Sequence, residues 1–363
     1  MPYLFIILSI VYFTLLIAIY VGLRRLKQQV TEAGDRSVSI VIAARNEENR
    51  ILPCLQSLET LAYPQDKYEI IFVDDCSTDG TADHIQEYCQ KHSHWNLIRL
   101  NEKSTELQGK KNALLNGIAR AKNDLIFTTD ADCVVSPGWL KKMTAYFQPG
   151  VSMVLGYSPL IPAKKPYFRL LQFDNLFSAI VSSAPTKLGY PFSSVGRNLT
   201  YRRDAYHDVG GFLSLKKFRS GDDTHLTSRF RYEKNGKIDF CADPDTFVLT
   251  RIPDSVSELF QQQVRKNSKT LHLSITSILL MCSVFFYYLC LFMLPVLQPG
   301  WYLTWLILVL LKFILEFISL YTAARIFRQS NLIKFIPLMQ IIYPVYIIFF
   351  SLIGLFQFYH WKK

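Results

Sequence analysis

The chain has 363 residues, enough for a catalytic domain and a further region but too many for one small domain. Half of the residues are hydrophobic, and 40 Lys and Arg outnumber 29 Asp and Glu, which is typical of a membrane protein with a basic face toward anionic lipid or an anionic substrate. The seven cysteines include no C-x-x-C pair, so neither a zinc site nor a disulfide framework is indicated, and a reducing compartment is expected for the soluble part.

An uncharged apolar run extends from Pro2 to Gly22 and is long enough to cross about 30 Å of hydrocarbon as a helix. A cleaved signal peptide is disfavoured, because no basic residue precedes the run and no small-x-small cleavage site follows it. Arg24, Arg25 and Lys27 come directly after it, which predicts that this end lies in the cytoplasm. We therefore expect an N-terminal transmembrane helix over residues 1–23.

From residue 37 the pattern alternates between strands and helices. The expected strands cover residues 37–44, 68–73, 96–100 and 125–129. A helical pattern follows each strand, and the first is expected to open at Arg45-Asn46-Glu47-Glu48. This alternation predicts an α/β domain with a doubly wound parallel sheet.

The fourth strand ends in two carboxylates, Asp130 and Asp132. Side chains at positions i and i+2 of an extended chain point the same way, so these carboxylates repel each other unless a cation lies between them. Carboxylate oxygens suit Mg²⁺ or Mn²⁺, and an open α/β sheet binds ligands at the carboxyl ends of its strands. The motif therefore predicts a metal–diphosphate site, while two solvated turn aspartates remain the alternative for the motif alone.

Other charged residues are expected at the same edge of the sheet. Asp74 and Asp75 end the second strand, and Arg45 follows the first. Lys110 or Lys111, after Gly109, would offset phosphate charge; the alternative is that both are solvated lysines at the start of a helix.

Three further apolar segments, at about residues 271–297, 301–324 and 332–356, are each long enough to span a membrane. The last contains Pro337 and Pro344, so it could instead be re-entrant or kinked. Glu316 is expected to pack inside the helix bundle. Residues 164–190 could form a helix in the membrane interface or an ordinary core-facing helix. Basic residues flank the segments: Arg265, Lys266, Lys269, Arg325, Arg328 and Lys334.

These flanking charges predict a multi-pass membrane protein with four spans, residues 23–269 in the cytoplasm and a C-terminal membrane domain over residues 270–363. The final Trp361-Lys362-Lys363 would then lie on the opposite side, against the rule. A transporter with a regulatory soluble domain is disfavoured, because four spans with one intramembrane acid give little support for a solute path.

Taken in order, five motifs resemble those of membrane-bound glycosyltransferases of family 2, which have the GT-A fold. They are Ala43-Ala44-Arg45-Asn46-Glu47-Glu48, Val73-Asp74-Asp75-Cys76-Ser77-Thr78-Asp79-Gly80-Thr81, Gly109-Lys110-Lys111-Asn112-Ala113-Leu114, Asp130-Ala131-Asp132 and Ser220-Gly221-Asp222-Asp223-Thr224-His225-Leu226. The resemblance covers residues 37–269 and implies a GT-A nucleotide-sugar-binding, Rossmann-like domain between N-terminal and C-terminal transmembrane helices.

The resemblance also implies roles for individual residues. Asp223 would be the catalytic base, and Asp130 and Asp132 would hold Mg²⁺ or Mn²⁺ on the diphosphate. The implied nucleotide-binding residues are Arg45, Glu47, Asp74, Asp75, Lys110 and Lys111. The implied acceptor-side or supporting residues are Arg197, Asn198, Asp222, Gln262 and Arg265.

One departure concerns the acceptor. Family members that polymerise sugars carry Gln-x-x-Arg-Trp before the membrane, whereas this chain has Gln262 and Arg265 but Lys266 in place of Trp. The sequence therefore favours an inverting transferase that adds one or a few sugars from a UDP- or GDP-linked donor to a lipid or lipid-linked glycan, with no nucleic-acid partner. The alternatives are a non-catalytic nucleotide-sugar-binding scaffold and a processive polysaccharide synthase.

Overall fold

The computed structural model describes residues 2–26, 35–102, 104, 107, 109–216, 218, 221–233, 236–268 and 275–355. Of the residues discussed above, Lys27, Ser220, Lys269, residues 271–274 and 356, and the C-terminal Trp361-Lys362-Lys363 lie outside these ranges. The chain divides into two compact units, which are described separately. One comprises Met1–Arg25, Ala163–Ile180 and Ile252–Lys363, and the other Leu26–Pro162 and Val181–Arg251.

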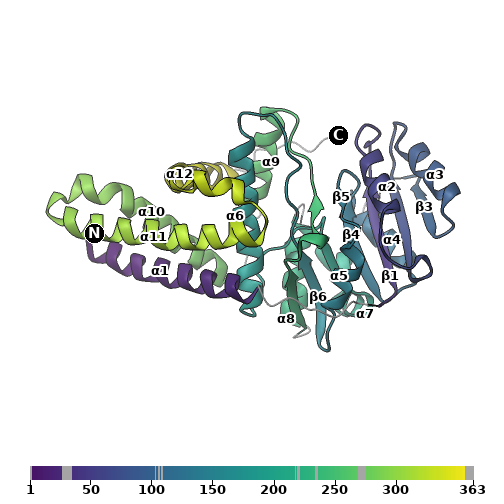
Figure 1. The fold of residues 1–363 in the computed structure, drawn as a ribbon, viewed down its shortest axis with the longest axis horizontal. Helices are drawn as coiled ribbons and strands as arrows, with labels where there is room; N and C mark the ends of the chain where they lie inside the picture. The colour runs from purple at the N-terminus through teal and green to yellow at the C-terminus, as the bar shows by residue number, and fades with distance from the viewer. Residues whose placement is uncertain are drawn as a thin grey trace. The chain divides into compact units, whose positions relative to one another are not determined.

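The second unit is built on a seven-stranded sheet in the order β3-β2-β1-β4-β7-β6-β8 (Figure 1). Its strands are β1 (Val38–Ala44), β2 (Tyr68–Asp75), β3 (Trp95–Leu100), β4 (Leu125–Asp130), β6 (Val151–Gly156), β7 (Leu199–Arg202) and β8 (Lys237–Cys241); β5 (Val134–Val135) pairs separately with β9 (Val248–Leu249). The sheet is mixed, because β7 runs antiparallel to both β4 and β6. The four strands expected from the sequence, β1 to β4, are parallel to their neighbours as predicted, and the antiparallel β7 was not foreseen.

Helices cover both faces of this sheet. Ile40, Phe72 and Phe127 share a buried cluster with residues of α2 (Leu52–Glu59) and α5 (Trp139–Ala145). On the other face, α4 (Lys110–Arg120) packs against β1 and β2. A Cβ at Gly117 would lie 2.4 Å from Cγ1 of Val41, so only glycine permits this close helix–sheet approach. With both faces covered, ligand chemistry is confined to the edge where the parallel strands end.

The helix expected to open at Arg45 begins only at Leu52. Asn46 has φ of 52°, and the backbone N–H of Glu47 donates to Oγ1 of Thr81, 2.8 Å away. The N–H of Glu48 donates likewise to Asp79 Oδ2, so the loop after β1 is tied to the loop that leads into α3 (Thr81–Lys91). Arg45 and Glu47 consequently stay at the carboxyl end of a strand.

The domain also contains α7 (Arg203–Asp208), α8 (Asp222–Glu233) and the 3-10 helices η1 (Gln65–Lys67), η2 (Gly211–Leu215) and η3 (Pro244–Thr246). Helix α6 (Phe168–Lys187) begins in the first unit. That unit also contains α1 (Pro2–Arg25), α9 (Val256–Ser268), α10 (Ile275–Leu297), α11 (Tyr302–Ile326), η6 (Ser330–Phe335) and α12 (Ile336–Leu355).

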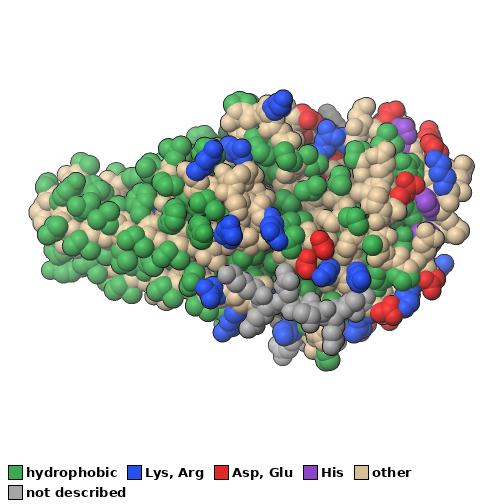
Figure 2. Space-filling model, in the orientation of Figure 1, with side chains coloured by type: hydrophobic (Ala, Val, Ile, Leu, Met, Phe, Trp, Pro, Cys, Tyr) green, Lys and Arg blue, Asp and Glu red, His purple; other side chains and the backbone are tan. Residues whose placement is uncertain are grey.

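Four stretches of the described residues are long and apolar enough to cross a membrane: Pro2–Arg25, Ile278–Leu297, Pro299–Ile326 and Ser330–Gly354. Figure 2 shows hydrophobic side chains over most of the visible surface of α1, α10 and α11, which contact one another. In water such a surface would be a large aggregation liability, whereas lipid solvates it without cost. The pattern supports membrane association.

Glu316 packs inside the helix bundle, as expected. It accepts hydrogen bonds from Tyr12 (2.6 Å) and Tyr288 (3.1 Å) and pairs with Lys312 Nζ at 2.9 Å, one helical turn earlier. Sequence reasoning overlooked Lys312, although a Glu four residues after a Lys inside an apolar helix indicates an internal ion pair.

Candidate active site

The acidic residues at the ends of β2 and β4 lie on one edge of the sheet, as the sequence predicts. The register places Asp74 beside Ala44 of β1 and Asp130 beside Ala43. Both strands run parallel to β1, so their carboxyl ends coincide. The loops that follow these strands therefore supply side chains to a common region.

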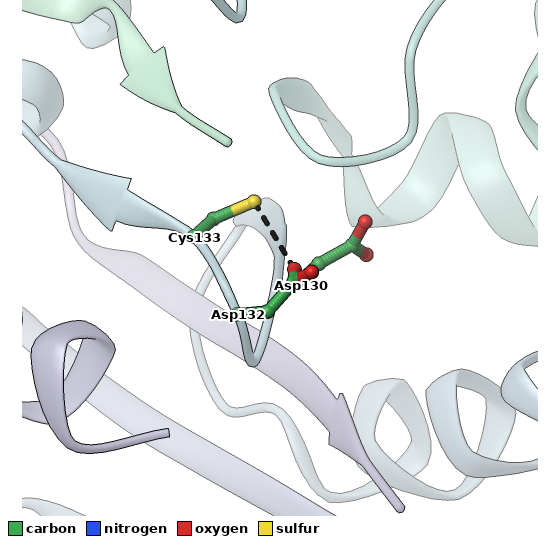
Figure 3. A group of neighbouring side chains, drawn as sticks. All are labelled: Asp130, Asp132 and Cys133. Carbon is green, nitrogen blue, oxygen red and sulfur yellow. Dashed lines mark hydrogen bonds between the residues drawn. The ribbon is translucent and has the colours of Figure 1, made fainter. Parts of the chain in front are cut away.

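Asp130, Asp132 and Cys133 form the centre of this region (Figure 3). One ligand atom from each of the three lies within 4.8 Å of the others. The Cys133 thiol is fully buried and donates a hydrogen bond to Asp132 Oδ1 at 3.5 Å, and burial together with both carboxylates raises the pKa of that thiol. A protonated thiol is a poor ligand, so the available donors are the carboxylate oxygens that suit Mg²⁺ or Mn²⁺.

The two carboxyl groups respond differently to their surroundings. Burial and the neighbouring Asp130 charge raise the pKa of Asp132. Burial also acts on Asp130, but Lys110 and then Arg197 outweigh it and lower the pKa of Asp130. A divalent cation between the carboxylates would remove the repulsion that disfavours charge on Asp132, so the residues present fit the metal that the sequence implies.

Two cationic side chains adjoin the carboxylate pair. Lys110 forms an ion pair with Asp130 and keeps 40 % of its side chain exposed. Arg197 acts electrostatically on Asp130, Asp132 and Cys133, and its buried Nε has no hydrogen-bond partner among the described residues. Arg197 was expected on the acceptor side or in a supporting role, and that role stays a prediction.

Lys111 turns away from this region. Its side chain is 7 % exposed, and its ammonium contacts the carbonyl of Phe218, the carbonyl of Leu215 at 3.4 Å and Asp222 Oδ1 at 3.4 Å. The expected contact of Lys111 with the nucleotide does not fit this buried position. Gly109, with φ of 64° and ψ of −141°, has a conformation open essentially to glycine and directly precedes α4, and the two lysines diverge because successive helical residues point about 100° apart.

Asp223 reaches the same region from the start of α8. Its Oδ2 accepts from the backbone N–H of Gly196 at 3.0 Å, and its Oδ1 accepts from Thr224 N–H at 2.9 Å. A Cβ at Gly196 would lie 3.5 Å from Asp223 Cβ and 3.6 Å from Lys110 Nζ, so the carboxylate and the ammonium lie on the same side of this glycine. The negative charge of Asp223 acts to raise the pKa of Asp130, so Asp223 is close enough to interact electrostatically with the carboxylate pair.

The residues expected to bind the nucleoside gather at the ends of β1 and β2. Arg45 Nη1 lies 3.6 Å from Asp75 Oδ2, with the Asp75 side chain buried. Asp74 Oδ1 accepts from the backbone N–H of Ser77 at 3.3 Å. Glu47 lies 4.0 Å from Arg50. Arg45 and Asp75 are thus adjacent, while their contact with a base stays a prediction.

Asn198 is a buried structural connection. Its Oδ1 accepts from Trp139 Nε1 at 3.0 Å, and its Nδ2 donates to the carbonyls of Tyr157 (2.8 Å) and Thr246 (2.9 Å). Both of its amide N–H donors are used inside the domain and its oxygen already accepts one hydrogen bond, which favours the supporting role over contact with an acceptor. Gln262 and Arg265 lie on α9 in the other unit, and their role at the acceptor stays a prediction.

Residues 39–210 match the sequence model of glycosyl transferase family 2. This segment belongs to glycosyltransferase family 2. Among curated relatives, the probable glycosyltransferase YdaM of Bacillus subtilis is 27 % identical over 201 residues, covering 53 % of this chain and 46 % of YdaM. The beta-monoglucosyldiacylglycerol synthase of Nostoc sp. is 29 % identical over 199 residues, covering 54 % and 42 %. The matched part is thus somewhat less than half the length of these relatives.

A solved structure confirms the fold of this family 2 domain. The mannosyltransferase PcManGT of Pyrobaculum calidifontis, solved in complex with GDP-Man and Mn²⁺, superposes with a TM-score of 0.56 over 89 % of this chain and 97 % of its own, at 18 % identity. The GT-A fold expected from the motifs is therefore confirmed.

Proposed function

We propose that the chain is an inverting, metal-dependent glycosyltransferase that moves a sugar from a UDP- or GDP-linked donor to a lipid or lipid-linked glycan. The observation that carries the proposal is the convergence of Asp130, Asp132, Lys110 and Asp223 beside the carboxyl ends of parallel strands. A protein that only bound nucleotide sugars would not need a further acid, Asp223, beside the pair formed by Asp130 and Asp132.

In this proposal Asp130 and Asp132 hold a divalent cation against the donor diphosphate. When bound, the cation offsets the charge that develops as the sugar–phosphate bond breaks. Lys110 and Arg197 add positive charge on the same side, and neither needs a large rearrangement because both already act on Asp130. Arg45 and Asp75 would contact the nucleoside.

Asp223 is proposed to accept the proton of the acceptor hydroxyl. The oxygen of that hydroxyl forms the new bond to the anomeric carbon as the bond to the nucleoside diphosphate breaks, which inverts the configuration at that carbon. The backbone N–H groups of Gly196 and Thr224 fix the orientation of the carboxylate without neutralising it. The proton is therefore transferred to the Asp223 carboxylate, whose orientation these two N–H groups hold before the acceptor binds.

The acceptor is proposed to be a membrane lipid or a lipid-linked glycan reached from the cytoplasmic face. Four apolar stretches of spanning length support a membrane location, and the similar Nostoc protein is named for a diacylglycerol product. The basic residues Arg24, Arg25 and Arg325 at the ends of α1 and α11 support a cytoplasmic catalytic domain.

A radiolabelled panel of UDP- and GDP-linked sugars, incubated with membranes that contain the chain, tests the proposal. Label should enter the lipid extract from one donor class, only with Mg²⁺ or Mn²⁺ present, and not with Asp223→Asn. Donor binding without any transfer across the panel would instead support a non-catalytic scaffold, and label retained in a high-molecular-weight glycan would support a processive synthase.

A further inference from the structure

Lys111, in the motif Gly109-Lys110-Lys111-Asn112-Ala113-Leu114, is a buried lysine. It is the second residue of α4, and only 5 % of the residue is exposed. A buried ammonium is costly unless its donors are satisfied. The ammonium of Lys111 donates hydrogen bonds to the carbonyls of Leu215 and Phe218, and Asp222 Oδ1, 3.4 Å away, forms an ion pair with it.

All three acceptors come from one short stretch of chain, residues 215–222, that joins η2 to α8; residues 217, 219 and 220 of it lie outside the described ranges. This stretch leads directly into Asp223. The ammonium thus links two segments more than a hundred residues apart in sequence. Fixing Leu215, Phe218 and Asp222 therefore fixes the point at which Asp223 enters the site.

The neighbouring lysine provides a contrast within the same helix. Successive residues of an α-helix point about 100° apart. Lys110 faces the carboxylate pair and remains 40 % exposed, whereas Lys111 faces the 215–222 segment and is 7 % exposed. The motif thus divides its two charges between the proposed diphosphate site and the segment that carries the proposed base.

We propose that Lys111 is a positioning residue that, through Leu215, Phe218 and Asp222, holds the start of α8 in the arrangement that presents Asp223 to the acceptor hydroxyl. This inference rests on the proposed role of Asp223. Substrate contact is not part of it, since the ammonium is buried away from the carboxylate pair.

Loss of the ammonium has a definite physical consequence. In Lys111→Met the two carbonyls lose a buried donor, and Asp222 loses its counter-charge beside Asp223. Burial already raises the pKa of Asp222, and Asp223 adds to the rise against the opposing effect of Lys111. The segment should therefore relax. A displacement of a catalytic group by about 1 Å can cost on the order of 10²-fold in rate.

The test uses the full-length chain in lipid nanodiscs and compares Lys111→Met with Lys110→Met as a matched control. For Lys111→Met we expect the turnover number to fall about 10–100-fold with the donor KM changed less than about threefold. Lys110→Met should instead raise the donor KM. Hydrogen–deuterium exchange of peptides covering residues 215–222 should be faster in Lys111→Met and unchanged in Lys110→Met.

A double mutant separates positioning from general destabilisation. In the Asp223→Asn background, Lys111→Met should cause little further loss, because the carboxylate that it positions is gone. A loss of the same factor in both backgrounds, or unchanged exchange of residues 215–222, would overturn the inference. If Asp223→Asn itself retains full activity, the proposed base is wrong, while the exchange result still decides whether Lys111 holds the segment.

If Lys111→Met does not fold, Asp222→Asn tests the same link with a smaller change. It keeps the side-chain shape and removes the charge that faces Lys111. We expect faster exchange of residues 215–222 and a turnover loss smaller than that of Asp223→Asn, with donor KM retained. Unchanged exchange in a folded Asp222→Asn protein would contradict the inference.

Discussion

The Asn198→Asp substitution tests whether Asn198 supports the fold or binds the acceptor. It replaces the amide by a carboxyl group and leaves the shape of the side chain almost unchanged. The amide nitrogen donates to the carbonyls of Tyr157 and Thr246 at 2.8 and 2.9 Å, and the residue is fully buried. An ionised Asp cannot donate, so both carbonyls would face a carboxylate oxygen.

The expected cost follows from these contacts. Each buried group left without its partner costs about 1–3 kcal/mol, so two carbonyls give about 2–6 kcal/mol in total. For a domain of this size, 1 kcal/mol corresponds to about 2–4 °C, and the apparent Tm should fall by about 5–20 °C. If the Asp protonates instead, one hydrogen bond is recovered and the loss lies at the lower end of this range.

Thermal unfolding in detergent at one fixed scan rate, followed by tryptophan fluorescence, measures the shift. Asn96→Asp is the matched control, because Asn96 is exposed on β3 and the same substitution there should move Tm by less than about 2 °C. A Tm close to that of the unsubstituted chain, together with a raised acceptor KM, would refute the reasoning and put Asn198 at the acceptor site.

Three further predictions concern the metal site, the helix bundle and the topology. Asp132→Ala should lose Mn²⁺ binding, measured by the electron paramagnetic resonance signal of free Mn²⁺, because one of the two carboxylate ligands is removed; unchanged binding would mean that the metal site is misplaced. Lys312→Met should destabilise the bundle by about 3–5 kcal/mol, because it leaves Glu316 buried without its cation, and adding Glu316→Gln should restore part of the loss in apparent Tm; a double mutant no more stable than the single one would contradict this. A reporter inserted near residue 200 should read as cytoplasmic, and an extracytoplasmic signal would reverse the topology.

The sequence predicted the parts of the site that depend on local pattern. Carboxylates that follow an apolar parallel strand, as Asp130 and Asp132 do, must lie at the edge of the sheet where the strands have their carboxyl ends. The structure has both residues at that edge. Glu316 was likewise predictable, because an acid in an apolar span has few alternatives to internal pairing.

Features that depend on packing between distant chain segments could not be predicted from local sequence patterns. Nothing in Lys110-Lys111 indicates which lysine turns inward, because that depends on where residues 215–222 pack. The direction of β7 and the burial of Asn198 against Trp139 depend in the same way on chain segments distant in sequence. The late start of α2 was partly foreseeable, since Pro53 suits the first turn of a helix.

The central claim is that Asp223 accepts the acceptor proton at a site where Asp130 and Asp132 hold the donor. The most direct measurement compares Asp223→Asn and Asp222→Asn for the transfer rate under saturating donor and, in a separate titration, for donor affinity. Asp223→Asn should keep donor affinity while transfer falls by on the order of 10²–10⁴-fold, and Asp222→Asn should lose less, because Asp222 pairs with Lys111. A larger loss in Asp222→Asn would exchange the two roles, and full transfer in both variants would remove this segment from the mechanism.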